Sequence, residues 1–477
     1  MSTYQLLWLR QDLRTFDHSA LHHAMAAGPT IAIVILSPQQ WRIHQDAAIK
    51  IDFYLRQLAS LQQQLQALNV PLLLLRVENW RDIAAAFADL AQQLPIKALY
   101  THIESGSNEQ LRDHMVKQTL QCQNITSHFF HDQTLFPFGS IRNKTGQPYQ
   151  VFGAFKKQCY ERLSVSLPQC YPVPEAQPAF DLALAAHFYH IPRLSELGFA
   201  DIPPQQQALW PVGEDAALDR LDDFIANQVE HYRHERDYPD LNGTSQLSPY
   251  LNTGLVSIRA CVQALFRAQY GDFHFNNEGQ QTWLDELLWR EFYQHIVFDF
   301  PQVSKHLPFK HNTQQIAWRN AAEDLAAWQQ GQTGIPIVDA GMRQMQATGW
   351  MHNRVRMIVA MFFSKNLLLD WRLGEAWFMQ HLIDGNLAAN NGGWQWCAST
   401  GTDAVPYFRI FNPVSQSQKF DPQGDYIRRW VPELADLDAK EIHDPYAKQP
   451  HRVLNYPRPM VDLKKSRLRA LEAFKAV

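Results

Sequence analysis

The sequence has little of what marks several common classes of protein. Its five cysteines show no paired spacing, so neither a disulfide framework nor a metal site is predicted from Cys122, Cys159, Cys170, Cys261 and Cys397. No apolar run is long enough to cross a membrane, because the run RMIVAMFF is followed at once by Ser364 and Lys365. The first residues, MSTYQLLWLR, lack the basic and apolar segments of a signal peptide. We therefore expect a cytoplasmic protein with no membrane partner.

The chain also lacks an excess of positive charge. Its formal net charge is −4, which excludes a globally basic nucleic-acid-binding protein. The charge is nevertheless uneven, since between positions 343 and 372 the single acid Asp370 stands against Arg343, Arg354, Arg356, Lys365 and Arg372. Such a local basic face can follow phosphates, although most faces of this kind are only solvated helix surface.

The length of 477 residues exceeds one ordinary core and predicts two or three domains. Continuous apolar runs at 5–10, 30–37, 70–77 and 96–103 predict buried strands of a parallel sheet, with helices between them. One such helix carries a core-facing stripe of leucines at Leu55, Leu58, Leu61, Leu65 and Leu68. We expect a Rossmann-like α/β domain over 1–132. No GxGxxG or GxxxxGK[ST] turn follows any of these strands, so the usual dinucleotide and P-loop interpretations fail.

The remainder of the chain predicts a linker followed by a helical domain. Residues 133–208 contain stretches such as PQCYPVPEAQPAF, which indicate an interdomain connection with little regular structure. From 209 to 477 the pattern is all-helical, with helical periods at 249–269, 279–298, 321–330, 336–347, 353–371 and 374–383.

The stretch from Asp384 to Asp403, DGNLAANNGGWQWCASTGTD, is unusually rich in amides, glycines and tryptophan. Glycine lets the backbone approach a flat ligand, amides can hydrogen-bond its edge, and Trp394 and Trp396 can stack on it or transfer electrons. A surface loop is the alternative, but such a loop has little reason to carry two tryptophans.

Three further segments carry candidate ligand contacts. In WLDELLWREFYQH, helical spacing places five side chains on one face, where the alternative is an internal Glu286–Arg290 ion pair: Trp283, Glu286, Trp289, Arg290 and Tyr293. In TGWMHNRVRM, His352 is expected at a helix end, with Asn353, Arg356 and Met357 on one side of the helix and Arg354 leaning away. In NGTSQLSPYL, Thr244, Ser245 and Ser248 precede a helix and form a candidate phosphate cradle, although many such helices bind nothing.

These segments, together with WLRQDLRTFDH, GQTGIPIVDAGMRQM and PYFRIFNP, resemble the photolyase/cryptochrome family along the whole chain. Within that family they are most similar to the class I cyclobutane pyrimidine dimer photolyases. The resemblance implies an α/β antenna domain and a helical FAD-binding domain. It further implies light-driven splitting of pyrimidine dimers in DNA by an electron from photoexcited, reduced FAD.

The resemblance also assigns residues to FAD. Asn390 corresponds to the residue that faces flavin N5. The other positions that match FAD contacts are Tyr232, Thr244, Ser245, Gln246, Leu247, Ser248, Trp283, Glu286, Arg290, Asn353, Arg356, Asp384, Gly385 and Asn386. Two of them depart from the family pattern: Gln246 stands where a basic residue is common, and Asn386 stands where relatives have aspartate.

Substrate, relay and antenna residues follow from the same resemblance. The partner is DNA that contains cyclobutane pyrimidine dimers, bound by a monomer through Arg236, Glu286, Trp289, Arg290, Tyr293, Asn353, Arg354, Met357, Trp396 and Arg409. An electron relay is implied for Trp318, Trp371 and Trp394. A 5,10-methenyltetrahydrofolate antenna, in preference to a deazaflavin, is implied by His44, Asn108, Glu109 and Lys305.

Two rival functions remain open. A cryptochrome would sense light and repair nothing, but Trp289, Met357 and Asn390 together favour repair. An enzyme for the six-four photoproduct would carry a histidine in the segment where this chain has Asn353.

Overall fold

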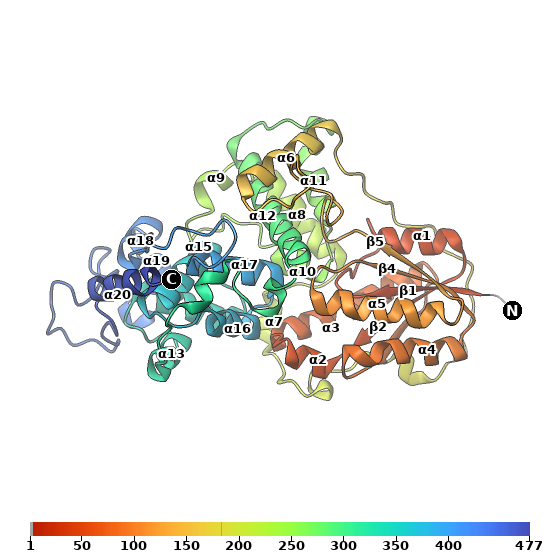
Figure 1. Cartoon of the computed structure of the whole chain (residues 1–477), viewed down its shortest axis with the longest axis horizontal. Helices are drawn as coiled ribbons and strands as arrows, with labels where there is room; N and C mark the ends of the chain where they lie inside the picture. Colours follow the sequence, from red (N-terminus) through yellow and green to blue (C-terminus); the bar gives the residue numbers. More distant parts are fainter. Residues whose placement is uncertain (1–2, 183) are drawn as a thin grey trace. The chain divides into compact units, whose positions relative to one another are not determined.

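The computed structural model describes residues 3–182 and 184–477, and their arrangement is drawn in Figure 1. The chain forms two compact units, one made of Met1–Val229 and Ser245–Pro301 and the other of Glu230–Thr244 and Gln302–Val477. Each unit thus contains two separate stretches of the chain. The predicted domain boundaries at 132 and 208 are a different division of the chain, and they stay a prediction.

The first unit contains a five-stranded parallel sheet, as the apolar runs predicted. Its strands are β1 (Tyr4–Leu9), β2 (Thr30–Leu36), β3 (Leu72–Arg76), β4 (Ile96–His102) and β5 (Thr126–Phe130), in the spatial order β3-β2-β1-β4-β5. All paired strands run parallel. The fifth strand was not predicted, because its sequence TSHFF is partly exposed and polar and therefore lacks a continuous apolar run.

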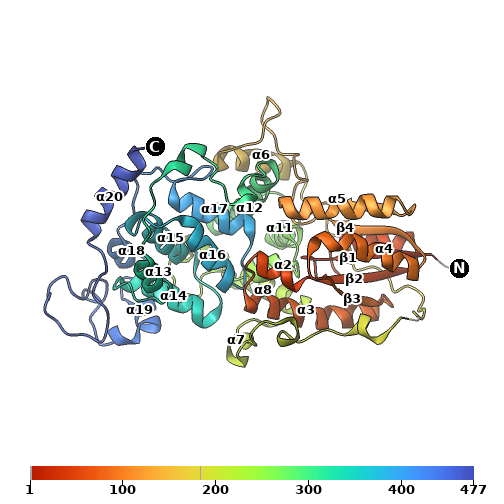
Figure 2. The same ribbon diagram turned by 60° about the horizontal axis from the view of Figure 1, so that its bottom comes forward.

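Helices cover both faces of this sheet, because successive strand residues point to opposite sides. On one face, Leu7 and Val34 pack with α1 (Ser19–Ala27) and α3 (Ala48–Ala67). On the other, Trp8 and Ile33 pack with α4 (Ile83–Gln93) and α5 (Ser107–Gln121). Figure 2 shows α3 and α5 on opposite sides of the strands. The predicted leucine stripe is buried in the core with α3, which confirms its structural role.

The remaining α-helices of the first unit are mostly short. They are α2 (Pro38–Ile43), α6 (Phe152–Val165), α7 (Pro204–Ala208), α8 (Glu214–Asn227), α10 (Ser248–Thr253), α11 (Ile258–Phe266) and the long α12 (Glu278–Asp299). The expectation of little regular structure throughout 133–208 is wrong for α6. Its apolar residues Phe152, Phe155, Cys159 and Leu163 are spaced by three and four and are all buried, which is an amphipathic pattern.

The second unit is helical. Its helices are α9 (Tyr232–Glu235), α13 (Ala322–Gln329), α14 (Pro336–Thr348), α15 (Asn353–Met361), α16 (Trp371–His381), α17 (Leu387–Ala398), α18 (Pro413–Phe420), α19 (Asp425–Trp430) and α20 (Leu463–Lys475). The helix predicted over 353–371 instead ends at Met361 and continues as a π-helical turn, η7 (Phe362–Asn366). The helix α17 was not predicted, because its glycines and amides hide the apolar period.

The core of the second unit is aromatic. Trp328, Trp371 and Trp394 are buried together with Phe363 and Phe378. The helix α17 packs against both α15 and α16 around this core (Figure 1). No helix within the described residues combines the length and the apolar character needed to cross a membrane.

Candidate functional site

In the second unit, two residues with a predicted FAD role form an ion pair. Arg356 of α15 donates from Nη2 to both oxygens of Asp384, at 3.0 and 2.9 Å, and from Nε to the backbone oxygen of Met351 at 2.7 Å. Asp384 is only 9% exposed, while Arg356 is half-buried. Gly385 follows Asp384 in the turn before α17, and Asn353 is exposed at the start of α15. His352 caps α15 by accepting from the backbone N–H of Arg354, so the expected helix-end role is confirmed.

The two asparagines with a predicted FAD role near the start of α17, Asn386 and Asn390, have different positions and different partners. Asn386 is the N-cap, and its side-chain oxygen accepts from the backbone N–H of Ala389 at 3.2 Å. Asparagine and aspartate cap helices about equally well, so this departure from the family pattern preserves the cap. Asn390 donates from Nδ2 to the backbone oxygen of Glu375 at 2.9 Å. Because that oxygen can only accept, the amide orientation is fixed, and Oδ1 of Asn390 points elsewhere as an acceptor.

The three predicted relay tryptophans belong to the same aromatic core. Trp394 is 2% exposed and Trp371 is 1% exposed, while Trp318 is half-buried and packs against this cluster and against Phe474. Trp328, which was not predicted, has its ring centroid 6.1 Å from that of Trp394. Sequence reasoning omitted Trp328 because no motif contained it.

Several residues with a predicted DNA role lie in this unit. Arg354 donates to Asp237 from Nη2 at 2.8 Å and from Nε at 3.2 Å, and its Nη1 lies 3.7 Å from the sulfur of Met357. The expectation that Arg354 leans away from Met357 is therefore wrong, because residues three apart share a helix face. Arg236 lies over the ring of the buried Tyr232, with 5.8 Å from Cζ to the ring centroid. Of the other residues with a predicted DNA role, Arg409 is exposed and Trp396 is half-buried. The same unit also holds Thr244, predicted for FAD and half-buried, and Lys305, predicted for the antenna and exposed in a short 3-10 turn.

In the first unit, the predicted face of α12 splits into buried and accessible residues. Trp283 is 2% exposed and packs beside Phe224. Trp289 is half-buried and stacks on Phe152 of α6 at 3.7 Å, with Tyr293 at 5.6 Å. Burial lowers the pKa of Arg290, whose Nη1 donates to the backbone oxygen of Gln133 at 2.6 Å. The half-buried Glu286 has contacts of its own. The accessible part of this face of α12 thus combines the rings of Trp289 and Tyr293 with the polar side chains of Glu286 and Arg290.

The predicted phosphate cradle runs into the first residue of α10. This helix begins at Ser248, with Leu247 as the N-cap, and the Oγ of Ser245 lies 3.5 Å from the backbone nitrogen of Leu247. Gln246 has a positive φ of 49°. Its side-chain oxygen accepts from Nη1 of Arg220 of α8 at 3.2 Å. A guanidinium therefore stands beside the position where the family pattern has a basic residue.

The predicted antenna residues of the first unit also lie together. Asn108 Nδ2 is 3.2 Å and Gln40 Nε2 is 3.0 Å from Nε2 of His44, whose ring meets Trp80 edge-on at 4.8 Å. Burial, reinforced by the carboxylate of Glu104, raises the pKa of Glu109 to about 7. The structure thus joins His44 to Asn108 through a hydrogen bond, and Glu109 follows in the first turn of α5.

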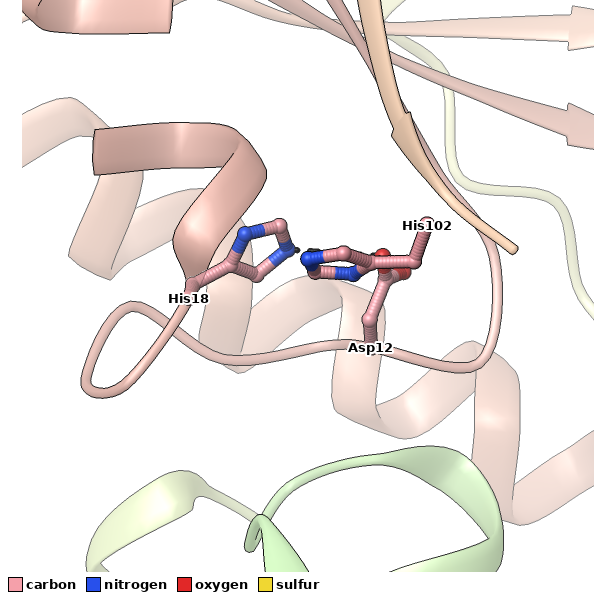
Figure 3. A group of neighbouring side chains, drawn as sticks. All are labelled: Asp12, His18 and His102. Carbon is pink, nitrogen blue, oxygen red and sulfur yellow. Dashed lines mark hydrogen bonds and ion pairs between the residues drawn. The ribbon is translucent and has the colours of Figure 1, made fainter. Parts of the chain in front are cut away.

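A buried cluster that sequence reasoning missed joins Asp12, His18 and His102 (Figure 3). His102 Nδ1 lies 2.6 Å and His18 Nε2 lies 3.4 Å from Oδ2 of Asp12. All three residues are at most 2% exposed. Burial alone would raise the pKa of Asp12, but hydrogen bonds from the two histidines hold it well below its usual range.

The ring nitrogens that face away from Asp12 already accept hydrogen bonds, so this cluster fits a closed hydrogen-bond network better than a metal site. His18 Nδ1 accepts from the backbone N–H of Leu21 at 3.0 Å, and His102 Nε2 accepts from that of Ala20 at 3.3 Å. Each neutral ring therefore carries its proton on the nitrogen that faces Asp12. Binding a metal through those nitrogens would move each proton onto a nitrogen that already faces a backbone N–H. The prediction of no metal site stays a prediction.

The predicted residues are divided between the two units, and each unit also holds a buried acid that sequence reasoning missed. Glu375 is 1% exposed and accepts from Asn391 at 2.9 Å and from His306 Nδ1 at 2.9 Å. Glu291, fully buried in α12, accepts from the backbone N–H groups of Leu135 and Phe136. The sequence offered one signal for these two residues, because an acid at a helical position that faces the core is rarely buried without a partner.

Comparisons with known proteins cover the whole chain. Residues 5–176 match a family model described as DNA photolyase, and residues 283–476 match one described as the FAD binding domain of DNA photolyase. A Vibrio cholerae protein named deoxyribodipyrimidine photo-lyase is 44% identical over 477 residues, with 99% of each chain covered. A class III photolyase structure from Agrobacterium tumefaciens superimposes with a TM-score of 0.86 at 34% identity, covering 100% of this chain and 98% of that one. A Synechocystis cryptochrome structure gives a TM-score of 0.88 at 27% identity, with 99% of each chain covered.

Proposed function

This chain belongs to the DNA photolyase family, and we propose that it is a light-dependent repair enzyme that splits cyclobutane pyrimidine dimers in DNA. One observation carries the proposal, which is 44% identity over the full length to a protein named deoxyribodipyrimidine photo-lyase. The parallel α/β part and the helical part with its FAD-binding domain are those of the family.

The residues of the second unit fit FAD. Bound in its reduced form, FAD supplies the light-driven electron that opens the cyclobutane ring. The acceptor Oδ1 of Asn390, fixed by the bond from Nδ2 to Glu375, suits a protonated ring nitrogen. The Arg356–Asp384 pair offers a positive and a negative edge within 3.0 Å of each other. In the first unit, we assign the backbone and hydroxyls of Ser245 and Ser248 to the phosphates.

The nearby Arg220 can compensate for the missing basic residue at Gln246. The family pattern has a basic residue where this chain has glutamine, and phosphates need a positive partner. Arg220 reaches this position from α8 and donates to Gln246 Oε1 at 3.2 Å. We therefore propose that Arg220 supplies the positive charge that the family pattern has at position 246.

For the substrate, we assign apolar contacts to Trp289 of the first unit and to Met357 and Trp396 of the second, with Glu286 as the acceptor for the bases. Trp289 suits this role because stacking on Phe152 holds its ring in place. Arg236, Arg354 and Arg409 are the proposed backbone contacts, and Tyr293 borders the same face of α12. Enzymes that act on a base within a duplex flip it out, and photolyases are a standard example of this behaviour.

The antenna assignment rests on the first unit. The half-buried His44 and Glu109 and the exposed Asn108, beside Trp80, offer an aromatic edge and polar groups. We propose 5,10-methenyltetrahydrofolate as its ligand. Lys305, from the other unit, is assigned on the resemblance alone. We further propose that the protein acts as a monomer.

A photoreceptor without repair activity is the second candidate, because a cryptochrome structure superimposes with a TM-score of 0.88. The deciding experiment illuminates the purified, reduced protein with oligothymidine that contains cyclobutane dimers. It follows the recovery of the ultraviolet absorbance of thymine, which returns when the ring double bonds that the dimer saturates are restored. A dark sample and undamaged oligothymidine serve as controls. Recovery of the thymine absorbance in the illuminated sample but not in the dark sample supports repair. A light-induced change in the flavin absorbance without any change in the thymine absorbance would favour the photoreceptor.

A further inference from the structure

A lysine is buried in the second unit without a carboxylate beside it. Lys365 lies in the π-helical turn η7, and its side chain is 0% exposed. Within the described part of the chain, no aspartate or glutamate forms an ion pair with it. A buried ammonium loses its hydration and is retained only where other groups compensate. Single π-helical turns of this kind occur frequently at functional sites.

The ammonium of Lys365 joins three parts of the unit. It donates to Oγ of Ser399 at 2.7 Å and to the backbone oxygen of Tyr407 at 3.1 Å. It also lies 4.1 Å from the centroid of the Phe474 ring in α20. Ser399 ends α17, and Tyr407 lies in the irregular segment that leads to α18. Lys365 therefore ties this segment to the core.

The segment from Ser399 to Phe411, here called the tied segment, has no helix or strand of its own after α17. Ser399 and Asp403 have positive φ values of 63° and 45°, which cost free energy in residues other than glycine. Its two ends are held by Lys310 N–H to Thr400 O at 2.9 Å and by Phe411 N–H to the sulfur of Met361 at 3.1 Å. The bond from Lys365 to Tyr407 holds its middle.

The middle of the tied segment is also its most exposed part. Tyr407 is 36% exposed and Phe408 is 59% exposed, and Arg409 follows them. Two accessible aromatic rings beside a guanidinium suit a nucleic acid, because rings stack on bases and arginine binds phosphates. Contact with DNA at this place is tighter when the segment is already held in one conformation, because binding then costs less conformational entropy.

We propose that Lys365 is a positioning residue for DNA binding, which orders the tied segment and makes that order depend on pH. This inference rests on the proposed function, since it needs DNA as the partner of Arg409. Lys365 itself touches neither DNA nor flavin in this proposal. It acts through the hydroxyl of Ser399 and the backbone of Tyr407.

The direction of the pH dependence follows from the surroundings of Lys365. Burial lowers its pKa to about 7, and the positive charge of Lys310 lowers it further; only a thiolate at Cys397 of α17 would act in the opposite direction. Burial raises the pKa of Cys397 itself to about 12, so this group stays neutral. The turn faces Phe474 on α20, where Arg469 donates to the backbone oxygen of Asn366.

If the segment detaches, the lysine is hydrated and its pKa returns toward about 10.4, the usual value for lysine. The ordered form then binds fewer protons than the detached form between these two values. Raising the pH above about 7 therefore favours the ordered form, by at most about tenfold per pH unit, and below about 7 the preference stays constant.

Hydrogen exchange of the free protein tests the ordering. We expect the protection factor of peptides within 399–411, corrected for the intrinsic exchange rate, to rise severalfold between pH 7 and pH 8.5. Lys365→Met keeps the length of the side chain but cannot titrate, so its protection factor is expected to be independent of pH. Lys440→Met, which removes an exposed lysine of the same unit, should reproduce the parent. A flat parental profile, or an equal slope in Lys365→Met, overturns the proposal.

If Lys365→Met does not fold, a second variant tests the same contact. Ser399→Ala removes one acceptor and leaves the lysine in place, so we expect lower protection of the tied segment at every pH with the slope retained. Parental protection in Ser399→Ala would overturn the role of this contact.

The affinity for dimer-containing oligothymidine tests the link to DNA. The Kd of Lys365→Met, divided by that of the parent, should be severalfold above one at pH 8.5 and should fall toward pH 7. A ratio that does not change with pH overturns the positioning role in DNA binding. A parent that shows the exchange profile but neither binds nor repairs this DNA contradicts the proposed function instead, so the two failures are distinguishable.

Discussion

Replacing Gly374 by alanine should force Trp394 out of its position. Gly374 lies buried in α16, and a Cβ atom built there would lie 2.7 Å from Cζ2 of Trp394 and closer still to Cη2 and Cζ3. The indole cannot move aside easily, because ring centroids of Phe378, Phe363 and Trp328 lie 5.0, 5.6 and 6.1 Å from it. We expect overlap with a rigid, enclosed ring to cost about 3 kcal/mol, at the upper end of typical overpacking.

The alanine also brings a gain, because it is a better helix former than glycine by about 1 kcal/mol. The net loss of stability is then about 2 kcal/mol, which in a unit of this size lowers the unfolding temperature by roughly 4–8 °C. Circular dichroism at rising temperature measures this change, and tryptophan fluorescence reports the altered environment of Trp394.

The matched control is Gly153→Ala in α6. No atom lies within 4 Å of a Cβ at Gly153, and the residue is exposed, so the same substitution should be neutral or slightly stabilising. An unfolding temperature of Gly374→Ala within 1 °C or so of the parent, where about 4 °C is the smallest expected shift, would refute the packing argument. It would mean that the core around Trp394 yields at little cost.

Four further predictions concern the proposed function. Trp318→Phe should block light-driven reduction of oxidised flavin yet leave repair by already reduced protein intact, because phenylalanine is much harder to oxidise than indole; photoreduction at the parental rate would remove Trp318 from the relay. Asn390→Ser should retain FAD but speed its reoxidation, because serine is too short to keep both the bond to Glu375 and a flavin contact, and unchanged reoxidation kinetics would count against this role. Arg220→Gln should raise the Kd for FAD about tenfold, in line with the loss of one charge-assisted hydrogen bond, and equal FAD retention during dialysis would contradict it. Arg354→Ala should weaken damaged and undamaged DNA alike, whereas Trp289→Ala should mainly remove the preference for damage, as filter binding to both DNAs can show.

Secondary structure could be predicted where one pattern dominates. The strands β1 to β4 are continuous apolar runs, and the helix α3 repeats leucine at three and four residues, so the parallel α/β part followed directly. The strand β5 and the helix α17 were missed for opposite reasons. The sequence of β5 is too polar for a buried strand, while that of α17 holds glycines and amides where a helix usually has apolar residues.

The site could be predicted only as a set of residue types. Helical spacing placed Asn353, Arg356 and Met357 on one face of a helix, but it misplaced Arg354 and could not supply partners that are distant in sequence. The bonds from Arg356 to Asp384 and from Asn390 to Glu375 span 28 and 15 residues, and no periodic pattern connects such positions. A resemblance names these residues, whereas only the fold shows which of them share a hydrogen bond.

The interleaving of the two units along the chain has a consequence for synthesis on the ribosome. The first unit needs Ser245–Pro301 for completion, since Glu291 of α12 binds the backbone at Leu135 and Phe136. Residues 230–244, which belong to the second unit, are therefore translated before the first unit can close, and they must wait until Gln302 and later residues emerge. The first unit can thus fold before the second, but only with residues 230–244 left as an unfolded loop between its two stretches. A slow stretch of translation shortly after codon 301 would help the first unit, whereas a pause near codon 229 would leave α12's binding surface exposed to aggregation.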